Sequence, residues 1–314
     1  MKVTVIGLGA IGGWLAARLA LGGHAVQAVV RPRTAAAIAG GLTLLEHGAE
    51  QVADIAVAAG AAEAQDLLVV ATKATDLADA AERARPYIGP GTLILPLQNG
   101  VPWWFVPGEP LRSVDGSGRI GRALSAARVI GGVVHAACRR TAPNRVEVVH
   151  ADRLILGEPD GGVSERVARL VEAFKAAGVP AEADPDVRRA IWYKLWGNMT
   201  INPLSATTGL TADRILADAV HRREIAAAME EARRVGEAIG CPITESAEAR
   251  LAVTARLGAF KTSMLQDAEA GRPIELEALV GAVREIGRRV GVPTPAIDGI
   301  EARTRAFAEQ RGLL

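Results

Sequence analysis

The chain has 314 residues, a length that suits two domains and allows substantial hydrophobic cores. Hydrophobic residues make up 49% and charged residues 23% of the sequence, as is ordinary for a soluble globular protein. The net charge of +1, without runs of like charge, argues against a dedicated nucleic-acid binder. No segment offers the ~18 apolar residues of a membrane span. Cys138 and Cys241 stand far apart, which favours a reducing cytoplasm over disulfide stapling.

Strands alternate with helices in the first part of the chain. The expected strands are 3–6, 25–30, 67–71 and 92–95, and the expected helices are 10–21 and 76–85. This alternation predicts an α/β fold with a parallel, doubly wound sheet of Rossmann type. Short strands at 129–134, 145–149 and 153–156 then predict an antiparallel extension of the sheet. A helix at 164–177 and a strand at 181–183 complete a predicted domain of residues 1–185.

From Asp186 onward the strand signals nearly vanish, and the sequence becomes rich in Ala, Leu, Glu and Arg. The expected helices are 187–203, 212–239, 245–257, 275–290 and 296–311. Residues 186–314 are therefore predicted to form an all-α C-terminal domain. Residues 101–128 have a loop-like composition instead.

A glycine fingerprint follows the first expected strand and opens the first expected helix, the context that gives this motif its mechanism. The fingerprint consists of Gly7, Leu8, Gly9, Ala10, Ile11 and Gly12. Gly7 permits the tight turn, Gly9 lets backbone amides approach a pyrophosphate, and Gly12 allows close packing of helix on strand. Because a helix N-terminus attracts anions, the motif predicts dinucleotide binding.

The end of the second strand indicates which dinucleotide binds. NAD-specific sites usually place Asp or Glu there, but no carboxylate precedes Glu46 in this chain. Arg31 and Arg33 occupy that region, and guanidinium groups suit a 2′-phosphate, so NADP(H) is predicted. Lys73 and Asn99 follow two further strands, at the sheet edge where ligands bind in such folds.

Lys194, Asn198 and Asn202 are spaced by four residues, which places them along one narrow stripe of a helix. The surrounding stretch is largely apolar, and a buried ammonium group is costly unless polar groups lie against it. A proton donor with two orienting amides, beside a dinucleotide fingerprint, suggests carbonyl reduction. The spacing alone leaves open a solvated lysine with two capping asparagines.

Five ordered motifs resemble the ketopantoate reductase (2-dehydropantoate 2-reductase) family over nearly the whole length. They are GLGAIG, TK after the strand at 67–71, QNG after the strand at 92–95, KLWGNMTINPLSA, and SMLQD followed by a glutamate. The resemblance implies a Rossmann domain that binds NADPH and a helical domain that closes over 2-dehydropantoate. It also implies reduction of this small 2-oxo acid to (R)-pantoate for pantothenate synthesis.

The same resemblance implies roles for single residues. The catalytic lysine falls on Lys194, its acidic partner on Glu275, and the phosphate-side basic residues on Arg31 and Lys73. The substrate-binding positions fall on Asn198, Asn202 and Ser263, and Asn99 is placed to reach both cofactor and substrate. Hydride addition to a ketone creates an alkoxide, which an ammonium group can protonate.

Departures from the family pattern leave alternatives open. Residues 207–212 and Phe260 stand where relatives offer asparagines, so another bulky 2-oxo acid is an alternative substrate. A non-catalytic NADP(H)-binding sensor is a third hypothesis. Trp103 and Trp104 either line the substrate mouth or pack the loop, with packing favoured. The scattered histidines predict no metal site, and a homodimer through the helical domain stays open.

Overall fold

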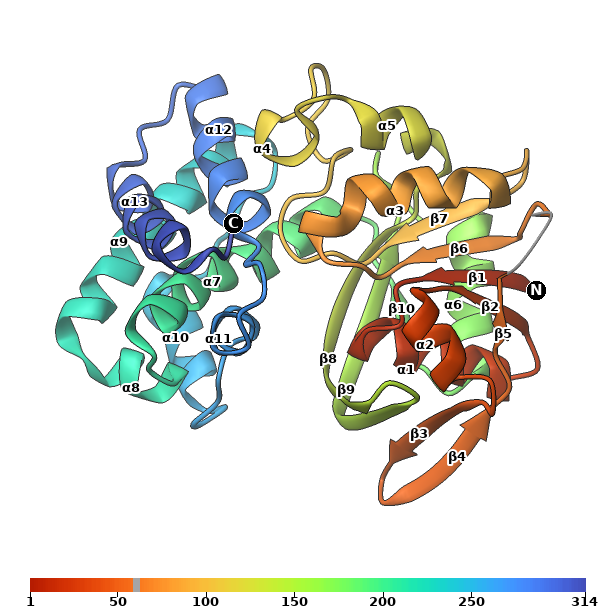
Figure 1. Cartoon of the computed structure of the whole chain (residues 1–314). Helices are drawn as coiled ribbons and strands as arrows, with labels where there is room; N and C mark the ends of the chain where they lie inside the picture. Colours follow the sequence, from red (N-terminus) through yellow and green to blue (C-terminus); the bar gives the residue numbers. More distant parts are fainter. Residues whose placement is uncertain (59–62) are drawn as a thin grey trace. The chain divides into compact units, whose positions relative to one another are not determined.

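The computed structural model describes residues 1–58 and 63–314. Its chain forms two compact units, traced in Figure 1. The first unit comprises Met1–Gln98 and Gly118–Ala190, and the second comprises Asn99–Ser117 and Ile191–Leu314. The domain limits 1–185 and 186–314 stay a prediction. Within the described ranges, no helix combines the length and apolar character needed to cross a membrane.

The first unit contains a five-stranded parallel sheet in the order β5-β2-β1-β6-β7. Its strands are β1 (Lys2–Ile6), β2 (Ala25–Val29), β5 (Ala56–Val57), β6 (Leu67–Val70) and β7 (Leu93–Pro96). The helices between them are α1 (Ala10–Leu21), α2 (Pro32–Ala37), η1 (Ala74–Asp76), α3 (Leu77–Ala84) and η2 (Arg85–Tyr87). Figure 1 shows α3 on one face of this sheet and α1 on the other. The predicted Rossmann-type architecture is confirmed.

A second sheet follows the order β10-β9-β3-β4, with β8 paired to β9. Its strands are β3 (Leu42–Glu46), β4 (Ala49–Ala53), β8 (Gly131–Ala142), β9 (Arg145–Gly157) and β10 (Ala181–Ala183). The three short strands predicted between 129 and 158 are in fact one long antiparallel hairpin. The helices α5 (Arg119–Ala123), η3 (Ala126–Arg128) and α6 (Glu165–Ala176) complete this unit. Ser164 caps α6 by accepting a hydrogen bond from the backbone N–H of Val167.

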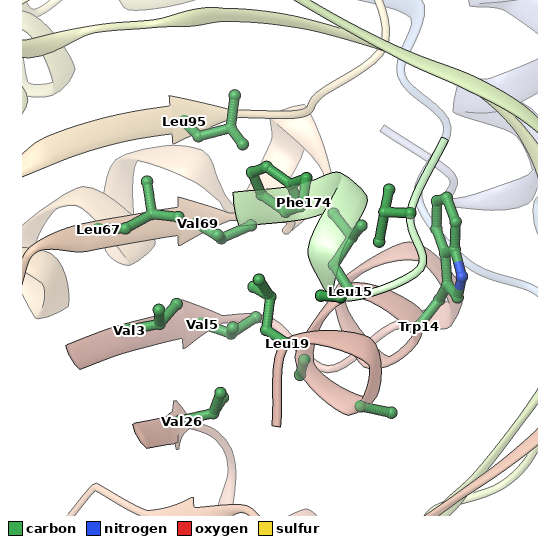
Figure 2. Packing of buried hydrophobic residues seen from close by; sticks show 14 of the residues in the cluster. Val3, Val5, Trp14, Leu15, Leu19, Val26, Leu67, Val69, Leu95 and Phe174 are labelled. Carbon is green, nitrogen blue, oxygen red and sulfur yellow. The ribbon is translucent and has the colours of Figure 1, made fainter. Parts of the chain in front are cut away.

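Helix α1 is buried on several sides because strands of both sheets contact it. Trp14, Leu15 and Leu19 are fully buried, and Figure 2 shows Leu15 and Leu19 facing the strand residues and Phe174 of α6. A Cβ atom added at Gly13 would lie 2.6 Å from the side chain of Val146 on β9. This close packing fixes α1, and with it the glycine turn that precedes it.

The second unit is helical, and α7 (Val187–Thr208) leads into it. Its other helical segments are α4 (Arg112–Asp115), α8 (Ala212–Ala217), α9 (Ala219–Ala238), α10 (Ala247–Ala255), α11 (Ser263–Glu269), η4 (Glu277–Gly281), α12 (Ala282–Arg289) and α13 (Pro295–Arg311). The predicted helix at 212–239 is broken because Asp218 caps α9 by accepting bonds from two backbone N–H groups. The predicted helix at 275–290 contains the π-helical segment η4.

Helices α7 and α9 are joined by two buried tryptophans. The indole N–H of Trp192 donates to the carbonyl oxygen of Ala232 at 3.2 Å, and that of Trp196 donates to Met229 at 2.6 Å. Gly236 allows this approach, since a Cβ atom there would lie 2.2 Å from the Trp192 nitrogen. The opposite stripe of α7, which carries Lys194, is thereby left for polar groups.

Candidate active site

The glycine turn between β1 and α1 fits a dinucleotide. Gly7 has a φ of 91°, a conformation that side chains rarely adopt, and it turns the chain sharply at the strand end. A Cβ atom at Gly12 would lie 2.0 Å from the carbonyl oxygen of Gly7, so only glycine permits this packing. At Gly9, by contrast, a Cβ atom would meet nothing within 4 Å. The turn is therefore tight on its inner side and open where a ligand would approach.

The electrostatics of α1 also suit an anion. The first turn of α1 contains no acidic residue, and Gly9 before it has no side chain to cap the helix. The N–H groups at a helix N-terminus have no partner within the helix and carry partial positive charge. Residues Gly7 to Gly12 could therefore hold the pyrophosphate of a dinucleotide.

The two basic residues that were expected to bind cofactor phosphates lie in the same unit as this turn. Arg31 precedes α2, and its side chain is 76% exposed, with Asp76 3.7 Å away. Lys73 follows β6 and precedes η1. The end of β6 is tied down by Gln98, whose amide nitrogen donates to the carbonyl oxygens of Val70 at 2.9 Å and Thr72 at 3.3 Å.

The helical unit brings together Lys194, Asn99 and Glu275. The ammonium nitrogen of Lys194 donates to the side-chain oxygen of Asn99 at 3.0 Å. Burial lowers the pKa of Lys194 to about 8, and the negative charge of Glu275 acts in the opposite direction. Glu275 itself is only 9% exposed. A titratable ammonium group is thus hydrogen-bonded to a neutral amide and stabilised in its charged form by a carboxylate.

The remaining predicted residues of this unit are less closely connected. Asn198 and Asn202 lie on successive turns of α7 beyond Lys194, with Asn198 half-buried and Asn202 buried. Ser263 is the first residue of α11 and is exposed, while the preceding Thr262 supplies the helix cap. The structure thus groups Lys194 with Asn99 and Glu275. Ser263 forms no hydrogen bond with these three residues.

Asn99 belongs to the helical unit although it follows strand β7. The next residue, Gly100, has a φ of 94°, and a Cβ atom there would lie 2.4 Å from the carbonyl oxygen of Ala278. The backbone N–H of Val101 donates to the same oxygen at 2.9 Å. These contacts fix the backbone beside Asn99 against η4, two residues beyond Glu275.

The far end of this segment is held by α12. Glu285 accepts bonds from the backbone N–H groups of Arg112 and Ser113, both at 2.9 Å. Arg289 donates to the carbonyl oxygens of Glu109 and Pro110, both at 2.7 Å. We call Glu285 and Arg289 the α12 clamp. The sequence analysis missed it, because no local pattern links positions more than 170 residues apart.

Aromatic packing reinforces the same segment. Phe105 is buried and stacks on Trp192 of α7, with ring centroids 5.9 Å apart and an interplanar angle of 17°. Trp103 is buried, and the half-buried Trp104 lies 6.2 Å from the Phe105 ring. The aromatic cluster therefore packs the segment against α7. In the described residues no group of His, Cys, Asp and Glu is arranged to hold a metal ion.

The sequence matches two protein-family models that together span most of the chain. "Ketopantoate reductase PanE/ApbA" matches residues 3–161, and "Ketopantoate reductase PanE/ApbA C terminal" matches residues 186–308. A 2-dehydropantoate 2-reductase of Mesorhizobium japonicum is 43% identical over 99% of both chains.

Solved structures of similar fold carry the same family name. A proposed ketopantoate reductase from Ralstonia solanacearum MolK2 is 46% identical, with a TM-score of 0.96 over 100% of this chain and 99% of that one. A 2-dehydropantoate 2-reductase from Methylococcus capsulatus is 31% identical, with a TM-score of 0.86 over 99% and 98% of the two chains. The chain therefore belongs to the ketopantoate reductase family of pyridine-nucleotide oxidoreductases.

Proposed function

We propose that this protein reduces 2-dehydropantoate to (R)-pantoate with NADPH, and that Lys194 is the general acid. The observation that carries the proposal is the Lys194 ammonium group, bonded to Asn99 and influenced by the charge of Glu275. The full-length similarity to enzymes named 2-dehydropantoate 2-reductase supports the choice of substrate. Asn198, Asn202 and Ser263 are proposed to bind the substrate.

The chemistry follows from the protein groups. When bound, NADPH supplies the hydride that adds to the 2-keto carbon. Negative charge then develops on the ketone oxygen, and the Lys194 ammonium group donates its proton to that oxygen. With a pKa of about 8, Lys194 is mostly protonated at neutral pH yet donates more readily than an ordinary lysine. Glu275 opposes the loss of charge that burial would otherwise cause.

Asn99 orients the proton donor. Its side-chain oxygen accepts from Lys194, so its amide N–H groups remain to donate to the cofactor or the substrate. The amides of Asn198 and Asn202 and the hydroxyl of Ser263 can bind carboxylate and hydroxyl oxygens without adding charge. A substrate anion would then add its negative charge beside the ammonium group and help keep it protonated.

The glycine turn suits either dinucleotide, and Arg31 supports NADPH over NADH. The turn from Gly7 to Gly12 accommodates a pyrophosphate, and the exposed Arg31 guanidinium suits an adenosine 2′-phosphate. The first carboxylate of the sequence, Glu46, lies in β3 rather than at the end of β2. The end of β2 therefore carries no carboxylate of the kind that usually binds the ribose hydroxyls in NAD-specific sites.

A second candidate is reduction of another bulky 2-oxo acid. The hydroxyl groups of Thr207 and Thr208 donate to carbonyl oxygens of Pro203 and Leu204 at the end of α7. These side chains are therefore engaged with the helix, in the segment where the family resemblance leads us to expect a substrate-binding asparagine. A changed substrate preference would follow from the loss of that amide.

A panel of 2-oxo acids, each assayed with NADPH and NADH, tests the proposal. We expect the highest kcat/KM for 2-dehydropantoate with NADPH. Lys194→Ala is expected to lower kcat by about 10²–10⁴-fold while NADPH still binds, because the proton donor is lost and the glycine turn is intact. A preference for a different 2-oxo acid would support the second candidate. Absence of ketone-dependent NADPH oxidation across the panel would overturn both.

A further inference from the structure

Arg140 reaches from the β8–β9 hairpin to the helix that follows Arg31. Its guanidinium nitrogen donates to the hydroxyl oxygen of Thr34 on α2 at 3.3 Å. The backbone N–H of Thr34 in turn donates to the carbonyl oxygen of Arg31 at 2.9 Å. The same guanidinium nitrogen also donates to the carbonyl oxygen of Pro143 at 2.7 Å, which fixes the arginine on its own hairpin turn. The Arg140 side chain is thus anchored on the first turn of α2, the helix that Arg31 directly precedes.

The charge of Arg140 is not balanced in the way that its neighbours' charges are. Arg139 lies 2.9 Å from a carboxylate oxygen of Glu147, and Arg145 pairs with Glu50. Among the residues that the structure describes, no carboxylate oxygen lies within 4 Å of the Arg140 guanidinium. Partial burial lowers the pKa of Arg140, as expected for a cation that has lost water without gaining an anion.

We propose that Arg140 is a second guanidinium for the adenosine 2′-phosphate and so a determinant of NADPH over NADH. This inference rests on the proposed use of NADPH. Guanidinium groups bind phosphate oxygens through paired, charge-assisted hydrogen bonds, and Arg140 is held in place by its bonds to Thr34 and Pro143. Arg31 would approach the phosphate from the end of β2, and Arg140 from the hairpin.

Direct binding measurements separate this role from a structural one. Dissociation constants for NADPH, NADH, 2′,5′-ADP and 5′-AMP are measured by calorimetry on the wild type, Arg31→Ala, Arg140→Ala and Arg139→Ala. For Arg140→Ala we expect NADPH and 2′,5′-ADP to bind about tenfold or more weakly, as is typical for loss of a hydrogen bond to a charged group. NADH and 5′-AMP should bind nearly as before. Arg139→Ala is the matched control and should change neither pair.

The outcomes distinguish this inference from the proposed function. If Arg31→Ala leaves the NADPH to NADH affinity ratio unchanged and the wild type does not favour NADPH, the proposed cofactor preference is wrong. If Arg31→Ala lowers the ratio while Arg140→Ala does not, only the role of Arg140 is overturned. An equal loss of affinity for both nucleotides in Arg140→Ala would also overturn it. Should that variant fold poorly, Arg140→Gln and Arg140→Lys are compared, and only lysine should preserve part of the ratio.

Discussion

Replacing Glu275 by glutamine is expected to move the alkaline limb of the pH–rate profile to lower pH. Burial lowers the pKa of Lys194 from 10.5 to about 8 even though Glu275 raises it. This lowering corresponds to about 3 kcal/mol against the charged form. An opposite charge nearby typically contributes about 1–3 pH units. Without the carboxylate, the pKa of Lys194 should therefore fall further, by about one pH unit or more.

The sign of the effect follows from the role of Lys194 as an acid. Only the protonated lysine donates a proton, so kcat/KM of the wild type should fall above pH 8, by about tenfold for each further pH unit. In Glu275→Gln the same fall should begin at least about one pH unit lower, and activity should recover as the pH is lowered. Steady-state kcat/KM is measured between pH 5.5 and 10 with saturating NADPH.

Two further variants serve as controls for the pH–rate profile of Glu275→Gln. Glu277→Gln changes a carboxylate two residues away that pairs with Arg305, and its profile should match that of the wild type. Lys194→Ala should retain no limb near pH 8 in its residual activity. An unshifted limb in Glu275→Gln would refute the electrostatic coupling. A wild-type limb at the pH of an ordinary lysine would refute the effect of burial.

Three further predictions concern the scaffold of the site. Gly12→Ala should lower the free energy of unfolding by about 1–3 kcal/mol, because its Cβ atom would lie 2.0 Å from the Gly7 oxygen. The same variant should show no NADPH binding in calorimetry. Retained affinity would contradict the tight turn. Phe105→Ala should cost about 3–5 kcal/mol in urea denaturation through loss of its buried stack on Trp192, and a cost below 1 kcal/mol would speak against that packing. Glu285→Gln should cost about 1–3 kcal/mol by weakening the α12 clamp, and unchanged stability with unchanged kcat would show that the clamp is dispensable.

Elements with strong local signals were predictable from the sequence. The strand at 3–6 and the glycine fingerprint together predicted a helix at 10–21, and α1 has these limits, Ala10–Leu21. The hairpin of β3 and β4 was missed because most residues of β4 are exposed, so no apolar alternation marks it. Its turn also uses His47 and Gly48, both with positive φ, rather than the usual Asn-Gly or Asp-Gly pair.

The candidate site was predictable in its residue types but not in its supports. Four-residue spacing placed Lys194 and its two asparagines on one stripe of α7, as the helix has it. The bond from Lys194 to Asn99 joins positions 95 residues apart. The clamp that Glu285 makes on Ser113 joins positions 172 residues apart. Contacts of this range arise from packing of whole elements, which periodicity within a single segment does not encode.

The assignment of Asn99–Ser117 to the helical unit bears on how the protein can be dissected. A recombinant fragment that starts at residue 186 would contain Lys194 and Glu275 but would lack the amide that binds the ammonium group. It would also leave Trp192 without its stacked ring and the carboxylate of Glu285 without two backbone donors. Chimaeras with relatives should therefore exchange both pieces of this unit together, since a single crossover near residue 186 would combine mismatched halves of the same site.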